Sequence, residues 1–466
     1  MQFITRDMEV CQKRKYILID IFASVIVWVL FFLYRVFVLE LNFYPPNIYF
    51  WILLCFYPLG WSFLHYLSGY YNKPYKKSRL QEFFTTFITT LIGCMFLFFV
   101  LLLDDPLDSM DWHKKSIGVL FFLQFTFTYI FRLIITTIVT KRIHRREIGY
   151  KTLVIGTGNR AKRFFSELKR MPQSLGYVID GFIYIGGKKA VPRPMICGLK
   201  SDLSLLLKER QIDTIVLASE EISVEVLNEW LPMLYSYRIN ILLLPEMYEV
   251  LMRGVKIDTI HGTPLIDLAC CPMPQWQQNV KRLSDFCFSA IALLLLSPVF
   301  LIIAFLVKKS SKGPIFYKQK RVGRYGELFT IYKFRSMYLN EENNKLVVDN
   351  DSRITPLGKI LRKYRIDELP QLWNILKGDM SLVGPRPEQP YFVKQIVKID
   401  PHYQLLFRLK PGLTSWGMVK YGYANNIQRM VERAKYDHLY MGNMNLLIDI
   451  KIIIYTIKTV LSGRGQ

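Results

Sequence analysis

The sequence contains 466 residues, enough for two or three domains, and 51% of them are hydrophobic. Mean hydropathy is +0.19, which is high for a soluble enzyme and indicates a membrane protein. A formal net charge of +24 in so apolar a chain favours anionic membrane surfaces and anionic substrates over nucleic acid as partners. The seven cysteines are odd in number and lack metal-ligand spacing, so we expect reduced thiols.

Four long apolar segments lie in the N-terminal third, each about the length that crosses a bilayer as a helix. They cover residues 16–39, 48–67, 83–103 and 116–139. Lys and Arg gather before the first segment, between the second and third, and after the fourth, whereas the other two loops carry mainly acidic residues. By the positive-inside rule, the N-terminus and everything after residue 140 are predicted to be cytoplasmic. The first segment is too long for a cleavable signal peptide, and we expect none.

Four ionisable residues, Asp20, Arg35, His65 and Arg132, lie in or near these segments. Intramembrane ionisable side chains point to function by default. Most of these residues are close to the end of a segment, where snorkelling to the interface is a sufficient explanation. We therefore interpret the bundle as a membrane anchor.

From residue 151 the pattern changes to alternating strands and helices. Strand-like runs occupy residues 151–155, 177–185, 213–218 and 239–244, with helical patterns between them, including one near 222–236. This order predicts a doubly wound, Rossmann-like parallel sheet.

The turn after the first strand reads G-x-G-x-x-A and carries Gly156 and Gly158, where a dinucleotide cofactor would bind. Asp180, the acid at about the right distance to bind ribose, falls inside its strand rather than at the strand end. Two interpretations stay open: a nucleotide-dependent redox or dehydratase enzyme acting through this turn, and a domain without a cofactor that serves regulation or dimerisation. We favour the second and expect no nicotinamide cofactor.

A fifth apolar segment, residues 286–307, is long enough to span a membrane. Ser297-Pro298 interrupts its middle, where proline removes a helix hydrogen bond and kinks the chain. Lys281 and Arg282 precede the segment and two lysines follow it, so both ends are predicted to stay in the cytoplasm. We expect a re-entrant helix–break–helix that enters one leaflet and returns, in preference to a fifth span.

Residues 365–387, which read RIDELPQLWNILKGDMSLVGPRP, are the most informative stretch. Asp367 and Glu368 stand just before Pro370, which suits a first helical turn, so the carboxylates are predicted at a helix N-terminus, where phosphate groups bind. Carboxylates repel phosphate unless a divalent cation or a covalent step accompanies them, and this conflict predicts phosphoryl chemistry. Arginine binds phosphate through a planar fork, so a surrounding cluster suits a diphosphate. The arginines of this cluster are Arg321, Arg335, Arg353, Arg362, Arg365 and Arg386.

Four motifs in this half carry a family resemblance: KFRSM at 333–337, DELPQL at 367–372, GDMSLVGPRP at 378–387 and KPGLT at 410–414. They closely resemble the bacterial polyprenyl-phosphate sugar-1-phosphate transferases, the monotopic phosphoglycosyl transferases that start glycan assembly. The resemblance covers about 275–466. The four spans and the Rossmann-like domain resemble the large members of that family, which serve capsule, exopolysaccharide or O-antigen synthesis.

The resemblance implies a two-step transfer. Asp367 would attack the β-phosphate of a UDP-sugar, release UMP and carry the phosphosugar until undecaprenyl phosphate accepts it. Glu368 would help to bind Mg²⁺, with Mn²⁺ as an alternative, and Arg386 matches the nucleotide-contacting arginine of the family. The predicted substrate-binding residues are Lys333, Arg335, Arg353, Arg362, Arg365, Pro385, Arg386 and Pro387. The residues that match the family's membrane hairpin are Lys281, Arg282, Asp285, Ser297 and Pro298.

The predicted fold is a membrane α-helical bundle, an α/β Rossmann-like domain and a mixed, mainly helical catalytic domain with a re-entrant membrane helix–break–helix. The boundaries are 1–145 for the bundle, 146–250 for the Rossmann-like domain, 251–280 for a linker, 281–310 for the hairpin and 311–466 for the catalytic domain. The implied partners are a UDP-sugar, undecaprenyl phosphate, the lipid bilayer and a second copy in a homodimer, without nucleic acid. The implied location is the bacterial inner membrane, multi-pass, with the N-terminus and both downstream domains cytoplasmic. A non-catalytic membrane scaffold is the other alternative.

This chain departs from the usual family pattern at two places. Relatives commonly have Thr-Gly and a glutamine where Ser415 and Met418 stand here, and Ser-Leu where Arg365-Ile366 precedes the acid pair. The loop change leaves the donor sugar open. Residues 445–461 have apolar side chains at helical spacing and fit either a membrane-surface helix or a core helix.

Overall fold

The computed structural model of this chain describes most of its length. The described residues are 2–38, 48–104, 110–186, 189–219, 234–235, 237, 239–244, 266–267, 273–338, 351, 353–422 and 424–461. They fall into two compact units, Met1–Leu153 with Lys162–Phe182, and Val154–Ala161 with Ile183–Gln466. Most of the predicted helix near 222–236 and of the predicted linker 251–280 lies outside the described residues.

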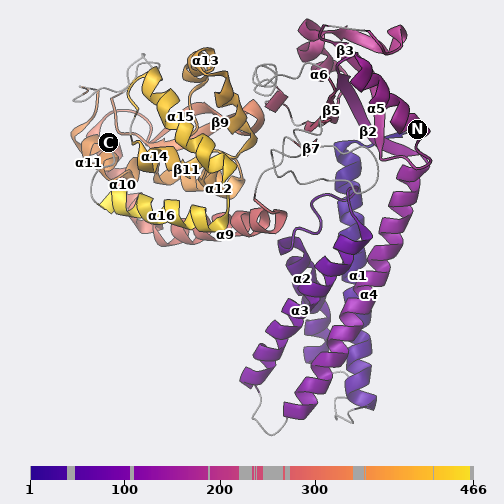
Figure 1. The fold of residues 1–466 in the computed structure, drawn as a ribbon. Helices are drawn as coiled ribbons and strands as arrows, with labels where there is room; N and C mark the ends of the chain where they lie inside the picture. Colours follow the sequence, from indigo (N-terminus) through magenta and orange to yellow (C-terminus); the bar gives the residue numbers. More distant parts are fainter. Residues whose placement is uncertain are drawn as a thin grey trace. The chain divides into compact units, whose positions relative to one another are not determined.

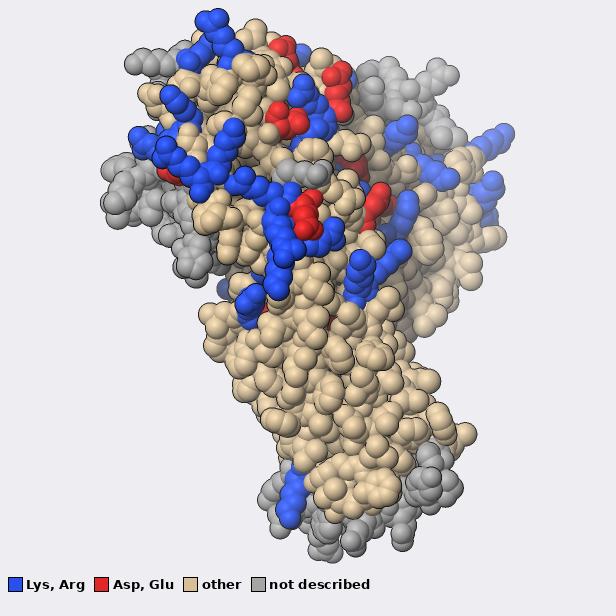
Figure 2. All heavy atoms as spheres, turned by 90° about the vertical axis from the view of Figure 1, so that its right-hand side faces the viewer, with Lys and Arg blue, Asp and Glu red and all other residues tan. Residues whose placement is uncertain are grey.

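Four helices form the bundle of the first unit: α1 (Arg6–Phe37), α2 (Ile48–Leu67), α3 (Arg79–Asp104) and α4 (Met110–His144). Each is long and apolar enough to cross a membrane, so the four predicted spans are confirmed as apolar helices. Helix α1 packs against α2 and α4, and α3 packs against α4. The bundle presents an almost uncharged face of side chains in Figure 2.

The interior of the bundle holds an ion pair between Asp20 of α1 and Arg132 of α4. Two guanidinium nitrogens donate to the carboxylate at 2.8 and 2.6 Å, and the two residues are 1% and 0% exposed. Tyr71 donates to Asp20 at 2.6 Å, and Glu82 of α3 accepts hydrogen bonds from Thr136 and Tyr70. The snorkelling interpretation is therefore wrong for Asp20 and Arg132, which point into the bundle because they satisfy each other there.

Among the described residues, a seven-stranded sheet combines β1, which precedes the bundle in the chain, with six strands that follow it. Its strands are β1 (Gln2–Phe3), β2 (Ile148–Ile155), β3 (Tyr177–Tyr184), β4 (Ile196–Leu199), β5 (Thr214–Leu217), β6 (Asn240–Leu243) and β7 (Ile266–Asp267). The strand order is β4-β3-β2-β5-β6-β7, with β1 paired to β2. Strands β5 and β6 run parallel from Thr214↔Asn240 to Leu217↔Leu243, and β7 is antiparallel to β6. The four predicted strands and the α/β class are confirmed, and the helices α5 (Asn159–Arg170) and α6 (Leu203–Glu209) lie between strands.

The next element is a bent helix pair, α9 (Gln275–Leu295) and α10 (Ser297–Ser310), whose axes differ by 63°. The break falls at the predicted Ser297-Pro298 step. Pro298 occupies the first turn of α10, where its missing N–H costs no helix bond, and the Ser297 hydroxyl donates to the Leu294 carbonyl at 2.7 Å. Large apolar side chains of both helices are exposed. Exposed apolar surfaces of this kind commonly mark a contact with a membrane or with another protein.

The C-terminal region is mixed and mainly helical, as predicted. It contains a hairpin of β8 (Phe316–Val322) and β9 (Leu328–Phe334) and a parallel pair of β10 (Ser381–Val383) and β11 (Gly412–Thr414). Its helices are α11 (Pro356–Lys363), the 3₁₀ helix η5 (Ile366–Gln371), α12 (Leu372–Lys377), α13 (Pro390–Ile399), the 3₁₀ helix η6 (Pro401–Arg408), α14 (Trp416–Lys420), α15 (Ile427–Gly442) and α16 (Leu446–Leu461).

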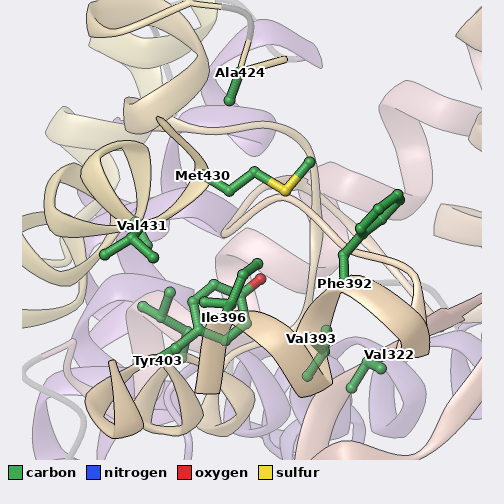
Figure 3. Packing of buried hydrophobic residues seen from close by; sticks show 10 residues of the cluster. Val322, Phe392, Val393, Ile396, Tyr403, Ala424, Met430 and Val431 are labelled. Carbon is green, nitrogen blue, oxygen red and sulfur yellow. The ribbon is translucent and has the colours of Figure 1, made fainter. Parts of the chain in front are cut away.

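One core cluster packs α13, α15 and η6 together. Figure 3 shows Phe392 and Ile396 of α13 beside Tyr403 of η6 and Met430 and Val431 of α15. Ile396 is fully buried, so the amphipathic face of α13 is directed into this core. These contacts fix α15 against α13, the helix that follows the Pro-Arg-Pro turn in the chain.

Candidate active site

The acid pair lies in the first turn of η5, in agreement with the prediction of a helix N-terminus. Asp367 and Glu368 are each 8% exposed, although isolated carboxylates are almost never so buried. The preceding Arg365 has a φ of 53°, in the left-handed region that a non-glycine residue adopts at an energetic cost. The Glu368 N–H donates to the Arg365 carbonyl at 3.2 Å, which fixes this turn. The chain is thus locally strained directly before the two carboxylates.

Glu368 lies among three cations from three elements. Its Oε1 accepts from Lys333 Nζ of β9 at 2.6 Å and from an Arg386 guanidinium nitrogen at 3.3 Å, and its Oε2 is 3.7 Å from Arg365. Burial by itself would raise the pKa of Glu368, but these three cations outweigh it and hold the pKa well below its usual value. Glu368 is therefore ionised and fixed in place.

Asp367 has the opposite character. Burial raises its pKa to about 6, with a further rise from the neighbouring Glu368 charge, while Lys333 and Arg362 act in the other direction. Two adjacent carboxylates therefore differ in pKa because only one of them is surrounded by hydrogen-bonded cations. Such separation of neighbouring acids is a mark of catalytic sites.

Two glycines hold the Pro-Arg-Pro turn against the KPGLT motif. A Cβ on Gly384 would lie 2.2 Å from the Lys410 carbonyl oxygen, and one on Gly412 would lie 2.2 Å from the Gly384 nitrogen. The Gly384 N–H donates to the Thr414 carbonyl at 3.0 Å, and the Gly412 N–H donates to the Pro385 carbonyl at 2.9 Å. Two motifs more than twenty residues apart are thus joined in one parallel pair, and Pro385, Arg386 and Pro387 leave its end.

Arg386 is held from both sides. One guanidinium nitrogen donates to Met418 Sδ at 3.2 Å and another to Glu368. The buried carboxylate of Asp437 in α15 accepts from the Gly417 N–H at 2.9 Å and also receives the backbone N–H of Arg386. Burial raises the pKa of Asp437 to about 6 despite these hydrogen bonds. Asp437 therefore ties the Pro-Arg-Pro turn to the loop in which this chain departs from the family.

Glu388 forms a second support directly after the turn. It accepts from Arg321 of β8 at 3.2 Å and from Arg433 of α15, and Arg321 also donates to the Pro387 carbonyl at 3.0 Å. Glu388, Arg433 and Asp437 were not predicted as site residues. Glu388 was signalled by its position after the motif, but nothing near Arg433 or Asp437 in the sequence indicates that α15 packs there.

The structure gives other predicted substrate residues different surroundings. Arg335 donates to the carbonyls of Val307 and Ser311 at 3.2 and 2.6 Å, at the C-terminus of α10. Arg353 pairs with Asp351 at 2.6 Å. Among the predicted cations, therefore, Lys333, Arg365 and Arg386 contact the acid pair, whereas the described contacts of Arg335 and Arg353 are elsewhere.

The hairpin residues Lys281, Arg282 and Asp285 bind the catalytic domain to α9. Lys281 Nζ donates to Asp449 at 2.5 Å and to the Val383 carbonyl at 2.9 Å. Arg282 donates to carbonyls at the end of α12, and Asp285 accepts from the Ser381 hydroxyl at 2.7 Å. These side chains fix β10 and α12 on the bent helix pair.

The glycine turn after β2 is closely packed. Gly156 has a φ of +118°, and a Cβ there would lie 2.8 Å from the Ala218 carbonyl oxygen, while Gly158 follows in the same turn before α5. The Arg160 guanidinium donates to the carbonyls of Ser219 and Leu244 at 2.8 and 3.0 Å, beyond the ends of β5 and β6. An arginine thus lies where a parallel sheet of this kind would receive a ligand.

The donor set at the acid pair is oxygen only, which suits Mg²⁺ or Mn²⁺ better than a softer metal such as Zn²⁺. No group of three or more His, Cys, Asp or Glu side chains suited to a metal occurs among the described residues. Mg²⁺ is commonly bound by one or two carboxylates together with substrate phosphates and water, and Asp367 and Glu368 would supply such carboxylates. Because Lys333 and Arg386 both contact Glu368 Oε1, a metal there would displace or share one of these contacts.

Comparison with known proteins gives consistent matches. The model of the family described as bacterial sugar transferase matches residues 276–463. The chain is 41% identical over 222 residues to a UDP-N-acetylgalactosamine-undecaprenyl-phosphate N-acetylgalactosaminephosphotransferase of Aeromonas hydrophila, which covers 47% of this chain and 52% of that protein. It is 30% identical over 318 residues to a UDP-glucose:undecaprenyl-phosphate glucose-1-phosphate transferase of Klebsiella pneumoniae, covering 67% of this chain and 68% of the relative. The matched regions thus span about half to two thirds of these relatives.

Proposed function

The chain belongs to the bacterial sugar transferases, and from this premise we propose that it transfers a sugar-1-phosphate from a UDP-sugar to undecaprenyl phosphate. The products are UMP and undecaprenyl-diphosphate-sugar, the lipid-linked start of a polysaccharide. One observation carries the proposal: two adjacent buried carboxylates, of which Glu368 is held by three cations and Asp367 is not. This arrangement provides one fixed charge and one carboxylate available for reaction.

In the first step, a carboxylate oxygen of Asp367 attacks the β-phosphorus of the UDP-sugar. A phosphorus–oxygen bond forms to Asp367, and the bond from the β-phosphorus to the bridging oxygen breaks, so that UMP leaves with the electron pair. In the second step, a phosphate oxygen of undecaprenyl phosphate attacks the same phosphorus and the bond to Asp367 breaks. The carboxylate is regenerated, and two anionic substrates meet the site in turn rather than together.

The cations around the pair would receive the diphosphate. Arg386 and Arg365 offer planar guanidinium groups, and Lys333 offers a compact charge on the same carboxylate. Mg²⁺, when bound by Glu368 and the diphosphate, would neutralise negative charge on the substrate. Asp437, through the Arg386 backbone N–H, and Glu388, through Arg321, would keep the Pro-Arg-Pro turn in position.

Exposed apolar side chains support a position of this domain at a membrane surface. They occur on α9, α10 and α16, and examples are Phe288 at 63%, Leu301 at 73% and Leu447 at 72% exposure. We propose that the bent pair α9–α10 is re-entrant and that α16 lies on the same membrane surface. With basic residues at both ends of the pair, the acid pair is on the cytoplasmic side of the inner membrane, where UDP-sugars are available.

The test is an assay of UMP release by the purified protein. Undecaprenyl phosphate, Mg²⁺ and a panel of UDP-sugars that includes UDP-glucose, UDP-galactose and UDP-N-acetylgalactosamine are supplied together. We expect UMP release with at least one donor and none from the variant Asp367→Asn. Absence of UMP with every donor, or full activity of Asp367→Asn, would reject the proposal.

A further inference from the structure

We propose that a second pocket of the C-terminal region, separate from the acid pair, binds the phosphate group of an anionic phospholipid. The pocket has a volume of about 400 Å³ and contains none of the residues that contact Glu368. Its lining includes the cations Arg282, Arg324 and Lys410, the acid Asp285, and the apolar residues Met273, Val383 and Met444. We call it the lipid pocket.

Lys410 is a partly buried cation that lines the lipid pocket. Its ammonium group has no hydrogen-bond or ion-pair partner among the residues that the structure describes. Burial lowers its pKa, and the nearby charges of Arg282 and Arg324 lower it further. A half-buried ammonium next to two other cations is stabilised by an anion, and phosphate is the anion that Lys and Arg bind together.

The acids near the lipid pocket are already occupied. Asp285 accepts from the Ser381 hydroxyl at 2.7 Å and from the Leu382 N–H at 3.1 Å, and Asp379 lies 3.5 Å from Lys377. Arg282 is held in place by the carbonyls of Ile375 and Leu376 at 2.7 and 3.0 Å. Arg282 is therefore preformed, and the charges of Asp285 and Asp379 offset the effects of burial, Arg282 and Arg324 on the Lys410 pKa only in part.

The position of the pocket along α9 favours a lipid over a soluble anion. Arg282 lies about one helical turn before Phe286, from which exposed apolar residues continue to the end of α9, and Trp276 in the first turn of α9 is exposed as well. The cations are thus at the polar end of the segment that we place in the membrane, at the height of lipid headgroups. Met273 and Met444, which line the same pocket, have flexible and polarisable side chains, which suit an irregular apolar group such as the start of an acyl chain.

A ligand bound in the lipid pocket would also affect the position of Arg386 in the candidate active site. The Lys410 carbonyl lies directly against Gly384, and both residues line the pocket. Gly384 is followed by Pro385 and Arg386, so a phosphate bound to Lys410 would restrain the segment that presents Arg386. We infer that an anionic phospholipid steadies the donor site without contacting Asp367.

The test measures lipid binding by the full-length protein in neutral detergent, without UDP-sugar. Phosphatidylglycerol and phosphatidylcholine are titrated in parallel, and the apparent Kd is read from the shift of the thermal unfolding transition and from native mass spectrometry. We expect phosphatidylglycerol to bind at least tenfold more tightly than phosphatidylcholine. Lys410→Gln should weaken that binding about tenfold or more. Lys398→Gln, which removes one exposed lysine of α13, should change it less than twofold.

Several outcomes would overturn the inference. These are equal binding of the two lipids, an unchanged Kd in Lys410→Gln, or an equal loss in Lys398→Gln. Inorganic phosphate and UMP form a separate arm: if either displaces phosphatidylglycerol completely at an equal concentration, the pocket takes soluble anions instead. If Lys410→Gln does not fold, Arg324→Gln takes its place. The inference uses the proposed membrane placement, but because binding is measured without turnover, its failure is distinct from failure of the proposed transfer.

Discussion

Neighbouring residues of the same chemistry behave differently at the centre of this protein. Asp367 and Glu368 are consecutive and equally buried, yet Lys333, Arg365 and Arg386 all contact Glu368. The difference arises from direction: β9 and the Pro-Arg-Pro turn present their cations to one side of η5. Part of this was predicted from sequence, because the acid pair, Lys333 and Arg386 lie in motifs. The different roles of Asp367 and Glu368 were not predicted, because they depend on contacts between residues that are 18 and 35 positions apart in the sequence.

The first prediction concerns pH. Burial raises the pKa of Asp367 to about 6, and only the ionised carboxylate attacks phosphorus. Activity should therefore fall as pH decreases through about 6, by about tenfold between pH 7 and pH 5. Because Lys333 lowers the pKa of Asp367, the residual activity of Lys333→Gln should fall at a higher pH than that of the wild type. UMP release measured from pH 4.5 to 8.5 decides this, and a profile that is flat below pH 7 would contradict it.

The second prediction concerns Glu368. Glu368→Gln removes the charge that holds Lys333 and Arg386 and would coordinate the metal. We expect UMP release to fall and the Mg²⁺ concentration for half-maximal activity to rise by about 10- to 100-fold. Glu432→Gln, at an exposed pair with Lys435 on α15, is the matched control and should leave both unchanged. An unaltered Mg²⁺ requirement in Glu368→Gln would remove Glu368 from the metal site.

At the scale of elements, the short parallel pair β10–β11 determines where the site residues lie. Only three residues form each strand, but the glycines at their ends allow the backbones to approach more closely than any side chain permits. Asp285 and Lys281 of α9 hold β10 from the other side. The GDMSLVGPRP and KPGLT motifs therefore contain the residues that pack β10 against β11 as well as residues of the candidate active site.

The third prediction tests the close packing of β10 against β11. In Gly384→Ala the new methyl group would lie 2.2 Å from the Lys410 carbonyl oxygen, so the strands must separate. We expect the free energy of unfolding to decrease by about 2–3 kcal/mol, with loss of activity, since overpacked sites cost this much. Gly442→Ala in α15 meets nothing within 4 Å and should leave stability unchanged or raise it by up to about 1 kcal/mol. Equal thermal transitions for the two variants would contradict the close approach.

Most elements follow from the sequence pattern. The four apolar helices, the strands β2, β3, β5 and β6, and the break at Ser297-Pro298 were predicted because hydrophobic period and proline act locally. The packing of Arg335 at the end of α10 and the support from Asp437 were not, because both depend on elements distant in the chain. Long-range polar contacts leave no local period, which is why the arginine cluster was predicted as a single group.

On the scale of the whole molecule, the membrane bundle has a polar interior that its sequence only suggested. Asp20 and Arg132 are buried and join α1 to α4, and Tyr71, Thr86 and Glu82 extend the contacts. A buried ion pair is strongly destabilising when one partner is lost, because the other charge is left without compensation. The pair therefore fixes the register of the two helices.

The fourth prediction follows from that pair. Arg132→Met should lower the free energy of unfolding by about 3–5 kcal/mol, because Asp20 remains buried and charged. The double variant Asp20→Leu/Arg132→Met should recover a large part of the loss. Arg142→Met near the end of α4, where the partner Glu147 is half exposed, should cost about 1 kcal/mol or less. Unfolding in detergent measures all three, and equal losses in Arg132→Met and Arg142→Met would argue against a stabilising interior pair.

The fifth prediction concerns topology. With a re-entrant α9–α10 pair, single cysteines introduced before α9 and after α10 are both on the cytoplasmic side. An impermeant thiol reagent added to whole cells should label neither until the membrane is opened. A protein with its reactive cysteines removed is the background, because Cys287 is exposed on α9. Labelling of the downstream cysteine alone in intact cells would make the pair a complete span.

The central claim is that Asp367 carries the phosphosugar between the two substrates. It is tested most directly by incubating the purified protein with Mg²⁺ and its UDP-sugar in the absence of undecaprenyl phosphate, followed by intact-protein mass spectrometry. We expect about one equivalent of UMP and a mass increase of one sugar phosphate, located by peptide mapping at Asp367 and absent from Asp367→Asn. Formation of undecaprenyl-diphosphate-sugar by Asp367→Asn at the wild-type rate, or turnover by the wild type without any adduct, would contradict it.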